Sequence, residues 1–124
     1  MTASGLKRQS SAPHLDDPST YAGPFDDWGI IPTMIEGTSR TSGVVLHKGS
    51  DGRPETGIWI CTPGTWACMV TRDELCHFLV GRCTYTHSSG EVIEVRPGTV
   101  AFFPEGWQGT CRVTETVRKV YMIR

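Results

Sequence analysis

The fold is decided by residues 57–123, which read GIWICTPGTWACMVTRDELCHFLVGRCTYTHSSGEVIEVRPGTVAFFPEGWQGTCRVTETVRKVYMI. Short runs rich in Val, Ile, Thr and aromatic residues alternate with breaks that contain Gly and Pro, a pattern typical of β-strands joined by turns. The predicted strands of the whole chain span residues 43–47, 57–62, 65–70, 75–80, 82–87, 91–95, 99–103, 109–114 and 117–123. Many short strands at this spacing predict an all-β sandwich or barrel.

One segment of this stretch also has helical spacing. Val113, Val117, Val120 and Tyr121 recur at intervals that would place them on one side of a helix. However, residues 110–123 are dominated by β-branched Thr, Val and Ile, whose side chains lose rotational freedom in a helix. We therefore predict two strands in this segment.

The beginning of the chain has a different composition. Residues 1–28 are rich in Ser, Pro, Gly and Asp, which disfavour regular structure over most of the segment. Tyr21, Phe25 and Trp28 do not suit a free tail, because their apolar area favours contact with a folded surface. The sequence thus predicts an N-terminal arm over residues 1–28, held against its own barrel or a partner's, and one domain over residues 29–124.

The charge of the chain is nearly balanced. Twelve Lys and Arg residues oppose 13 Asp and Glu residues, which gives a net charge of −1, and the basic residues are scattered. Neither a nucleic-acid partner nor a membrane surface is therefore expected. No apolar run is long enough to span a bilayer, and the N-terminus lacks the apolar core of a secretory signal, so a cytoplasmic location is expected.

The cysteines are odd in number and contain no Cys-x-x-Cys pair. They are Cys61, Cys68, Cys76, Cys83 and Cys111. Each lies in an apolar, strand-like run, and a disulfide framework is not expected. We predict that they are reduced and act as small apolar side chains in the core.

Three sequence motifs are more specific than this pattern. The first is Glu74, followed after six residues by Gly81. The second is Gly98, followed after five residues by Pro104-Glu105-Gly106. The third is the segment TETVRKVYMI, which contains Lys119, and a Ser-Ser-Gly-Glu hairpin separates the first two motifs.

In this order, the three motifs resemble the cupin superfamily. More narrowly, they resemble the small single-domain cupins grouped with the ureidoglycine aminohydrolase cupin domain. The resemblance covers more than half of the chain. It implies a double-stranded β-helix, the RmlC-like jelly-roll barrel.

The resemblance also shows which metal ligands are missing. A metal-binding cupin has two histidines shortly before the motif glutamate and a third histidine after the second motif. The corresponding positions hold Cys68 and Val70, or Ala67 and Met69 in the alternative spacing, and Gly109. Only Glu74 matches, and a transition metal needs about three or four ligands. The four histidines of the chain are not placed to replace the missing ones, so we predict no metal and no cofactor.

The placed motifs, together with the two-residue period of a strand, define the side of each strand that faces the barrel interior. The predicted ligand-binding residues are Glu74, Lys119, Trp66, Cys68, Cys76, Phe103 and Cys111. Phe102 is the alternative to Phe103 at the floor of the pocket, and Trp107 either lines the entrance or covers the barrel end.

Several alternatives remain open at this level. Glu74 is either a structural partner of Lys119 or a positioned acid that contacts a ligand. Lys119 either points inward or lies along the barrel rim, since its strand is apolar on both sides. Cys68, Cys76 and Cys111 form, in a less favoured alternative, a thiolate set with Glu74 for zinc or copper(I).

Two functions are compatible with these features. The first is a metal-independent barrel that binds a small polar molecule with a carboxylate and an amine or ureido group; the sequence does not decide whether it is an enzyme. The alternative is a non-catalytic, dimeric binding or regulatory module. A homodimer is expected in either case, because the aromatic residues of the arm suit an interface.

Overall fold

Nine β-strands and no helix make up the part of the chain that the computed structural model describes, residues 12–124. The strands are β1 (Asp26–Ile30), β2 (Met34–Glu36), β3 (Arg40–Lys48), β4 (Glu55–Cys61), β5 (Gly64–Met69), β6 (Glu74–His87), β7 (Val92–Val95), β8 (Val100–Phe103) and β9 (Gln108–Ile123). Every strand pair is antiparallel. The prediction of an all-β chain is confirmed, and the described residues include no helix that could cross a membrane.

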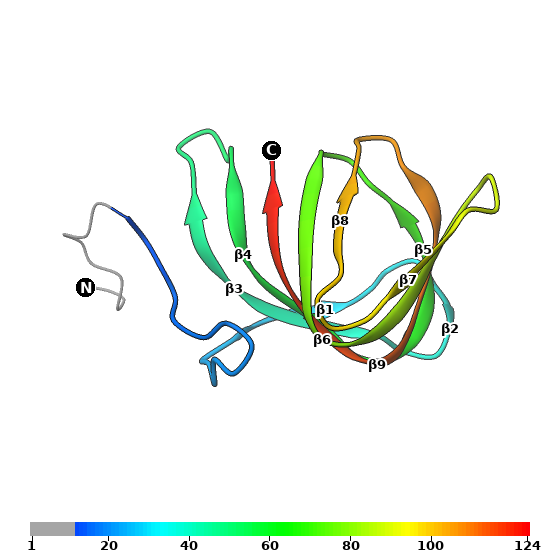
Figure 1. The fold of residues 1–124 in the computed structure, drawn as a ribbon, viewed down its shortest axis with the longest axis horizontal. Coiled ribbons are helices and arrows are strands. Elements are labelled where there is room, and N and C mark those ends of the chain that lie inside the picture. Colours follow the sequence, from blue (N-terminus) through cyan, green and yellow to red (C-terminus); the bar gives the residue numbers. More distant parts are fainter. Residues whose placement is uncertain (1–11) are drawn as a thin grey trace.

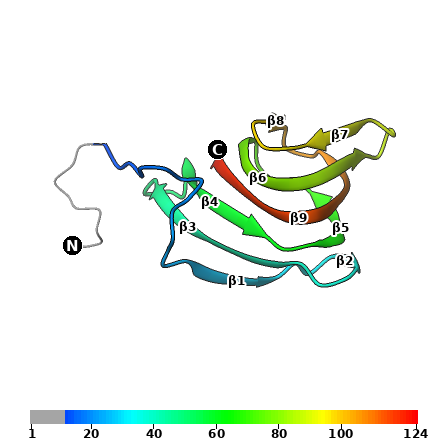
Figure 2. The same cartoon turned by 60° about the horizontal axis from the view of Figure 1, so that its bottom comes forward.

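Two long strands, β6 and β9, run through both halves of the sheet. In one half, the first part of β6 pairs with β8 on one side and with the last part of β9 on the other. From β9 the sheet continues through β4 and β3 to β1. In the other half, the last part of β6 pairs with β7 on one side and with the first part of β9 on the other. From β9 the sheet continues through β5 to β2. The sheet therefore curls round on itself, as Figures 1 and 2 show.

Both long strands bend where the two halves meet. The pairing of β6 with β9 is irregular between Phe78 and Cys83, and Gly81 has a φ of 87°. A side chain at Gly81 would collide with the backbone oxygen of Thr116 on β9. The two pairs of strands predicted over 75–87 and 109–123 are thus wrong in one respect: each pair is a single bent strand, because a bulge bends a strand without ending it.

The core lies between the two halves and contains most of the cysteines. Cys61, Cys76, Cys83 and Cys111 are at most 2% exposed, and all five cysteines are free thiols. They pack with larger side chains, among which Phe78 is fully buried. The predicted role of these cysteines as small apolar core residues is confirmed.

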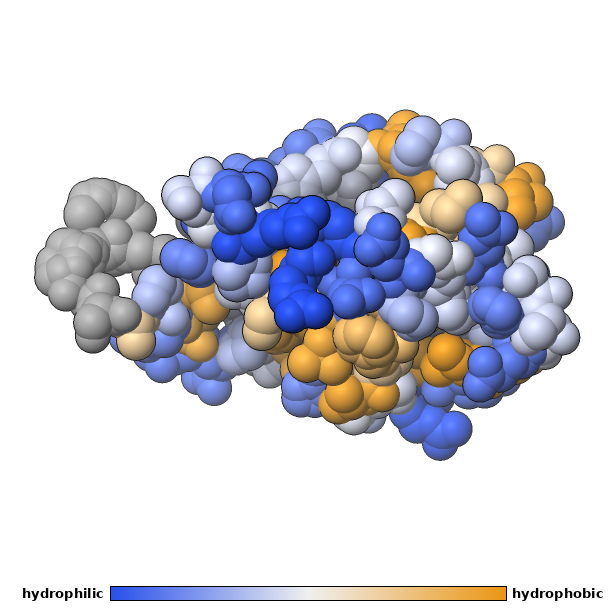
Figure 3. All heavy atoms as spheres, turned by 90° about the horizontal axis from the view of Figure 1, so that it is seen from above, coloured by the Kyte–Doolittle hydropathy of each residue, from blue (hydrophilic) through white to orange (hydrophobic). Residues whose placement is uncertain are grey.

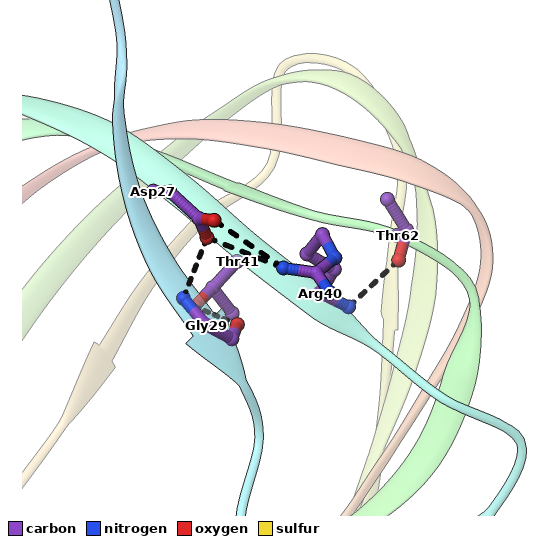
Figure 4. Close-up of polar contacts among 5 residues, drawn as sticks. All are labelled: Asp27, Gly29, Arg40, Thr41 and Thr62. Carbon is purple, nitrogen blue, oxygen red and sulfur yellow. Dashed lines mark hydrogen bonds and ion pairs between the residues drawn. The ribbon is translucent and has the colours of Figure 1, made fainter.

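Strand β1 lies at the edge of the sheet and is held to β3 by side chains (Figure 4). Asp27 Oδ1 accepts a hydrogen bond of 2.9 Å from the Gly29 amide and one of 3.4 Å from Arg40 Nη1. Thr41 Oγ1 donates to the Gly29 carbonyl at 2.9 Å, and the Arg40 amide donates to Thr62 Oγ1 at 2.8 Å. These bonds fix a bulge in β1 and join β3 to the turn after β4.

Trp28 is the extra residue of this bulge. Asp27 pairs with Ser42 and Gly29 pairs with Thr41, so Trp28 has no partner in the register. Its indole ring lies over Gly43 of β3, with ring atoms 2.5 and 2.7 Å from the place that a Cβ atom at Gly43 would occupy. The bulge in β1 and the absence of a side chain at Gly43 together allow the Trp28 ring to reach the pocket described below.

The segment before β1 is attached to the barrel through Arg118 of β9. Arg118 Nη1 donates hydrogen bonds to the carbonyl oxygens of Pro18, at 3.0 Å, and Tyr21, at 2.8 Å. Its guanidinium carbon lies 5.3 Å from the centre of the Phe25 ring. This part of the predicted arm thus contacts its own barrel. Residues 1–11 of the arm lie outside the described residues, and the domain boundary at residue 29 stays a prediction.

The outer face of β8, β6 and β9 carries a row of exposed apolar side chains. Phe102, Leu75 and Met122 lie side by side on these strands and are 58%, 46% and 45% exposed. Figure 3, which looks onto the upper end of the barrel in Figure 1, shows hydrophobic residues gathered beside a strongly hydrophilic group. Phe102 therefore faces outward, and Phe103, at 2% exposure, is the inward residue of the two. The homodimer expected from the sequence stays a prediction.

Candidate ligand-binding pocket

A pocket of about 330 Å³ lies at the end of the barrel where β4 and β6 begin and β9 ends, the upper end in Figure 1. Its aromatic walls are formed by Trp28, Trp59, Trp66, Tyr85, Phe103 and Tyr121. Its charged lining residues are Glu55, Arg72, Glu74 and Lys119. Pockets that bind small molecules commonly combine apolar walls with a few placed polar groups, and this pocket has that character.

The central polar contact joins Glu74 to Lys119. Lys119 Nζ donates a hydrogen bond of 2.8 Å to Glu74 Oε2, and the two side chains are 7% and 20% exposed. Of the two directions that the sequence leaves open for Lys119, the structure shows the inward one, in which the side chain reaches Glu74. Glu74 Oε1 has no hydrogen-bond partner among residues 12–124, so one carboxylate oxygen is left for other contacts.

Lys119 also lies between two aromatic rings. It pairs in register with Trp59 on β4 and with Phe78 on β6. Its Nζ atom lies 4.4 Å from the Trp59 ring centre and 5.7 Å from that of Phe78, within the range of cation–π attraction. Burial is the largest influence and disfavours the charged form, but Glu74 and Cys76 together more than offset it and hold the pKa of Lys119 above its usual range. The side chain is therefore a fixed ammonium at neutral pH.

The three predicted pocket thiols lie at different depths. Cys68 is half-buried and lines the pocket. Cys76 is fully buried beside it, and its Sγ donates to Glu74 Oε2 at 3.3 Å. Cys111 lies in the core and is not a lining residue. Burial raises the pKa of Cys68 to about 11 and that of Cys76 to about 12, so both remain protonated at neutral pH.

The structure thus brings together five of the seven residues predicted for ligand binding. Glu74, Lys119, Trp66, Cys68 and Phe103 line the pocket, whereas Cys76 and Cys111 do not. Whether any of them binds a ligand stays a prediction.

Sequence reasoning did not place several lining residues. Tyr121 could have been found, because it has the same parity as Lys119 on β9 and therefore faces the same side. Trp59 needed the register of β4 with β9, which the sequence does not supply. Arg72 lies in the connection between β5 and β6, where no strand period applies.

Trp107 belongs to an aromatic cluster with Tyr85 and Phe103, which line the pocket, and with His87. Its ring centre lies 5.9 Å from that of Tyr85, 5.1 Å from that of Phe103 and 5.3 Å from that of His87. It is not among the lining residues. Of the two roles considered from the sequence, covering the barrel end is the one that this position supports.

The residues at the usual cupin metal position do not fit a metal ion. Nowhere in residues 12–124 do three or more His, Cys, Asp or Glu side chains lie close enough to hold one, and this includes the proposed set of Cys68, Cys76, Cys111 and Glu74. The one motif carboxylate, Glu74, is engaged by an ammonium group. A side chain at Gly109, where the third histidine would stand, would collide with the backbone oxygen of Thr86. The chain's own Lys119 supplies the positive charge beside Glu74.

The thiol of Cys68 is expected to react slowly in the native protein. At pH 7.5 its thiolate fraction, and hence its alkylation rate, should be about 100-fold lower than that of an exposed thiol, because its pKa is raised from 9.0 to about 11. The rate should rise with pH up to about that pKa. Mass spectrometry after iodoacetamide treatment, with urea-unfolded protein as the control, measures this difference. Equal labelling of native and unfolded Cys68 would contradict it.

The antiparallel sheet that curls round a pocket at one end defines a cupin-type barrel. The family model of the EutQ-like cupin domain matches residues 48–121. The chain belongs to this family. No curated protein matches the chain in sequence.

Solved structures share this fold at low sequence identity. A DUF861-family protein of unknown function from Pseudomonas syringae pv. tomato has a TM-score of 0.75 and 20% identity, over 83% of this chain and 45% of that one. A putative ethanolamine utilization protein Q from Salmonella typhimurium has a TM-score of 0.59 and 22% identity, over 68% of each chain. A cupin superfamily protein from Desulfitobacterium hafniense has a TM-score of 0.56 and 13% identity, over 67% of this chain and 75% of that one. The described chain thus spans less than half of the Pseudomonas protein, and the cupin jelly-roll fold predicted from the motifs is confirmed.

Proposed function

We propose that this cupin domain binds a small polar organic molecule in the pocket at the barrel end, without a metal ion. The observation that carries the proposal is the buried pair of Lys119 and Glu74 at the wall of an aromatic pocket. The unpartnered Glu74 Oε1 can accept a hydrogen bond from an amine or ureido N–H, and Trp59 and Trp66 offer flat apolar surface.

Two similarities narrow the molecules worth testing. The narrower resemblance to the ureidoglycine aminohydrolase cupin domain points to ureido acids. The similar structures from Salmonella typhimurium and Clostridium difficile are named for ethanolamine utilization or as EutQ, which points to small amines. A pocket of about 330 Å³ is at the small end of the usual range for ligand sites and fits molecules of this size.

Thermal unfolding in the presence of N-carbamoylglycine, glycine and ethanolamine tests the proposal. At least one of the three is expected to raise the melting temperature, with a stabilisation of about 2.7 kcal/mol at a concentration 100 times its Kd. The stabilisation should survive EDTA, and Glu74→Gln should weaken it. The matched control Glu94→Gln changes an exposed carboxylate on β7 and should leave it unchanged. If none of the three stabilises the protein, or if stabilisation requires added metal, the proposal fails.

The alternative function, a non-catalytic dimeric binding or regulatory module, stays a prediction. Both functions use the same pocket, but the alternative does not require the pocket to bind one of the small amines or ureido acids tested above. A barrel whose melting temperature responds to none of these small molecules would favour the alternative.

A further inference from the structure

Arg72 stands out among the charged residues of the pocket. It lies in the connection between β5 and β6, is half-buried, and lines the pocket. Its Nη2 atom donates a hydrogen bond of 2.7 Å to the carbonyl oxygen of Gly52 in the loop between β3 and β4. Its Nε atom is buried and has no hydrogen-bond partner in the described part of the chain.

The other charges of the pocket are compensated. Glu74 is paired with Lys119. Glu55 accepts a hydrogen bond of 2.7 Å from the Tyr121 hydroxyl and lies 3.9 Å from Lys48 Nζ. Arg72, by contrast, has no carboxylate within 4.0 Å among the described residues. The pocket therefore carries one positive charge that its own side chains do not balance.

We propose that Arg72 is the anion-binding residue of the pocket and that it selects ligands with a carboxylate group. The inference rests on the proposed function, since it names the charge of the molecule that the pocket would bind. A partly desolvated guanidinium without a counter-ion is unfavourable, and a carboxylate that accepts two of its N–H groups relieves this cost. Lys119 is less suited to this selection, because Glu74 already neutralises it.

The backbone geometry supports a binding role for Arg72. The hydrogen bond to Gly52 joins two loops at the same end of the barrel, the upper end in Figure 1. One guanidinium nitrogen is thereby fixed, and the planar group is left with N–H donors that the described residues do not use. A fixed fork of this kind recognises a planar carboxylate better than it recognises a neutral amide.

Calorimetric titration of the full chain with two probes tests the inference. The probes are N-carbamoylglycine and N-carbamoylglycinamide, which differ only in the carboxylate. The wild-type chain is expected to bind the acid more tightly than the amide. Arg72→Gln, which removes the positive charge and keeps a shorter polar side chain, should weaken binding of the acid by about 10- to 100-fold and leave binding of the amide unchanged. Arg96→Gln, at an exposed arginine in the turn between β7 and β8, is the matched control and should change neither.

Each result has a defined meaning. If the wild-type chain binds both probes equally, or if Arg72→Gln keeps the preference for the acid, the inference is overturned while binding in the pocket stands. If Arg72→Gln weakens both probes alike, Arg72 shapes the pocket without selecting charge, and the inference is again overturned. If the wild-type chain binds neither probe, the inference fails, and the proposed function then depends on glycine and ethanolamine.

Discussion

Replacing Lys119 by methionine should lower the free energy of unfolding by about 3–5 kcal/mol at pH 7, the range measured when one member of a buried ion pair is removed. Methionine keeps most of the apolar contact with Trp59 and Phe78. The loss would therefore come from Glu74, which is only 20% exposed and would lose its positive partner. Urea unfolding, followed by tryptophan fluorescence, measures the change.

The pH dependence separates this cause from a packing defect. In the wild-type chain the pKa of Lys119 is raised, so its contribution is fully present below its usual value of 10.5 and is lost only as the pH rises beyond it. The Lys119→Met variant lacks this ammonium group, so the difference in stability between the variant and the wild type should shrink as the pH rises above 10.5. The double variant Lys119→Met with Glu74→Gln should lose less free energy of unfolding than the sum of the losses in the two single variants. A Lys119→Met variant as stable as the wild type would show that Glu74 needs no cation.

The second large effect is expected at Gly81. Gly81→Ala should lower the free energy of unfolding by about 3 kcal/mol or more, because the residue has a φ of 87° and the new Cβ would collide with the Thr116 backbone oxygen. Gly90→Ala is the matched control. Gly90 has a similar φ of 100°, but no atom lies within 4 Å of its added Cβ.

The difference between the two glycines isolates the contact between β6 and β9. Gly90→Ala should lower the free energy of unfolding by about 1–2 kcal/mol, which is the cost of placing an alanine at positive φ without any collision. Thermal unfolding of both variants, followed by circular dichroism, gives the comparison. Equal losses of melting temperature at the two positions would mean that β9 moves aside easily and that the bend at Gly81 is not fixed by packing.

Gly81 also shows how far the sequence could predict this fold. The motif of Glu74 and Gly81 includes this residue, and the predicted strands 75–80 and 82–87 leave Gly81 between them. The observed bulge differs from a break because hydrogen bonding to β9 resumes at Arg82. Local composition cannot distinguish the two, since both need a residue with positive φ, and only the partner strand decides between them.

The pocket was predictable where the strand period applied. The Glu74 motif and the alternation along β5 and β6 placed Glu74, Trp66 and Cys68, and the direction of Lys119 stayed open because its strand is apolar on both sides. Trp28 and Arg72 could not be predicted. Trp28 reaches the pocket through a bulge that shifts its register, and Arg72 through a loop held by the Gly52 carbonyl. Both depend on contacts between segments far apart in the chain.

The position of β9 has a consequence for how the protein is made. This strand is late in the chain and yet pairs with β4, β5 and β6, so it joins both halves of the sheet. During synthesis, the earlier strands leave the ribosome before their common neighbour exists, and their edges stay unpaired until residues 108–123 follow. Folding of the barrel must then wait for translation of this segment, and pairings so distant in sequence form slowly. The nascent chain would expose unpaired strand edges for that interval, which is when chaperones would protect it from aggregation.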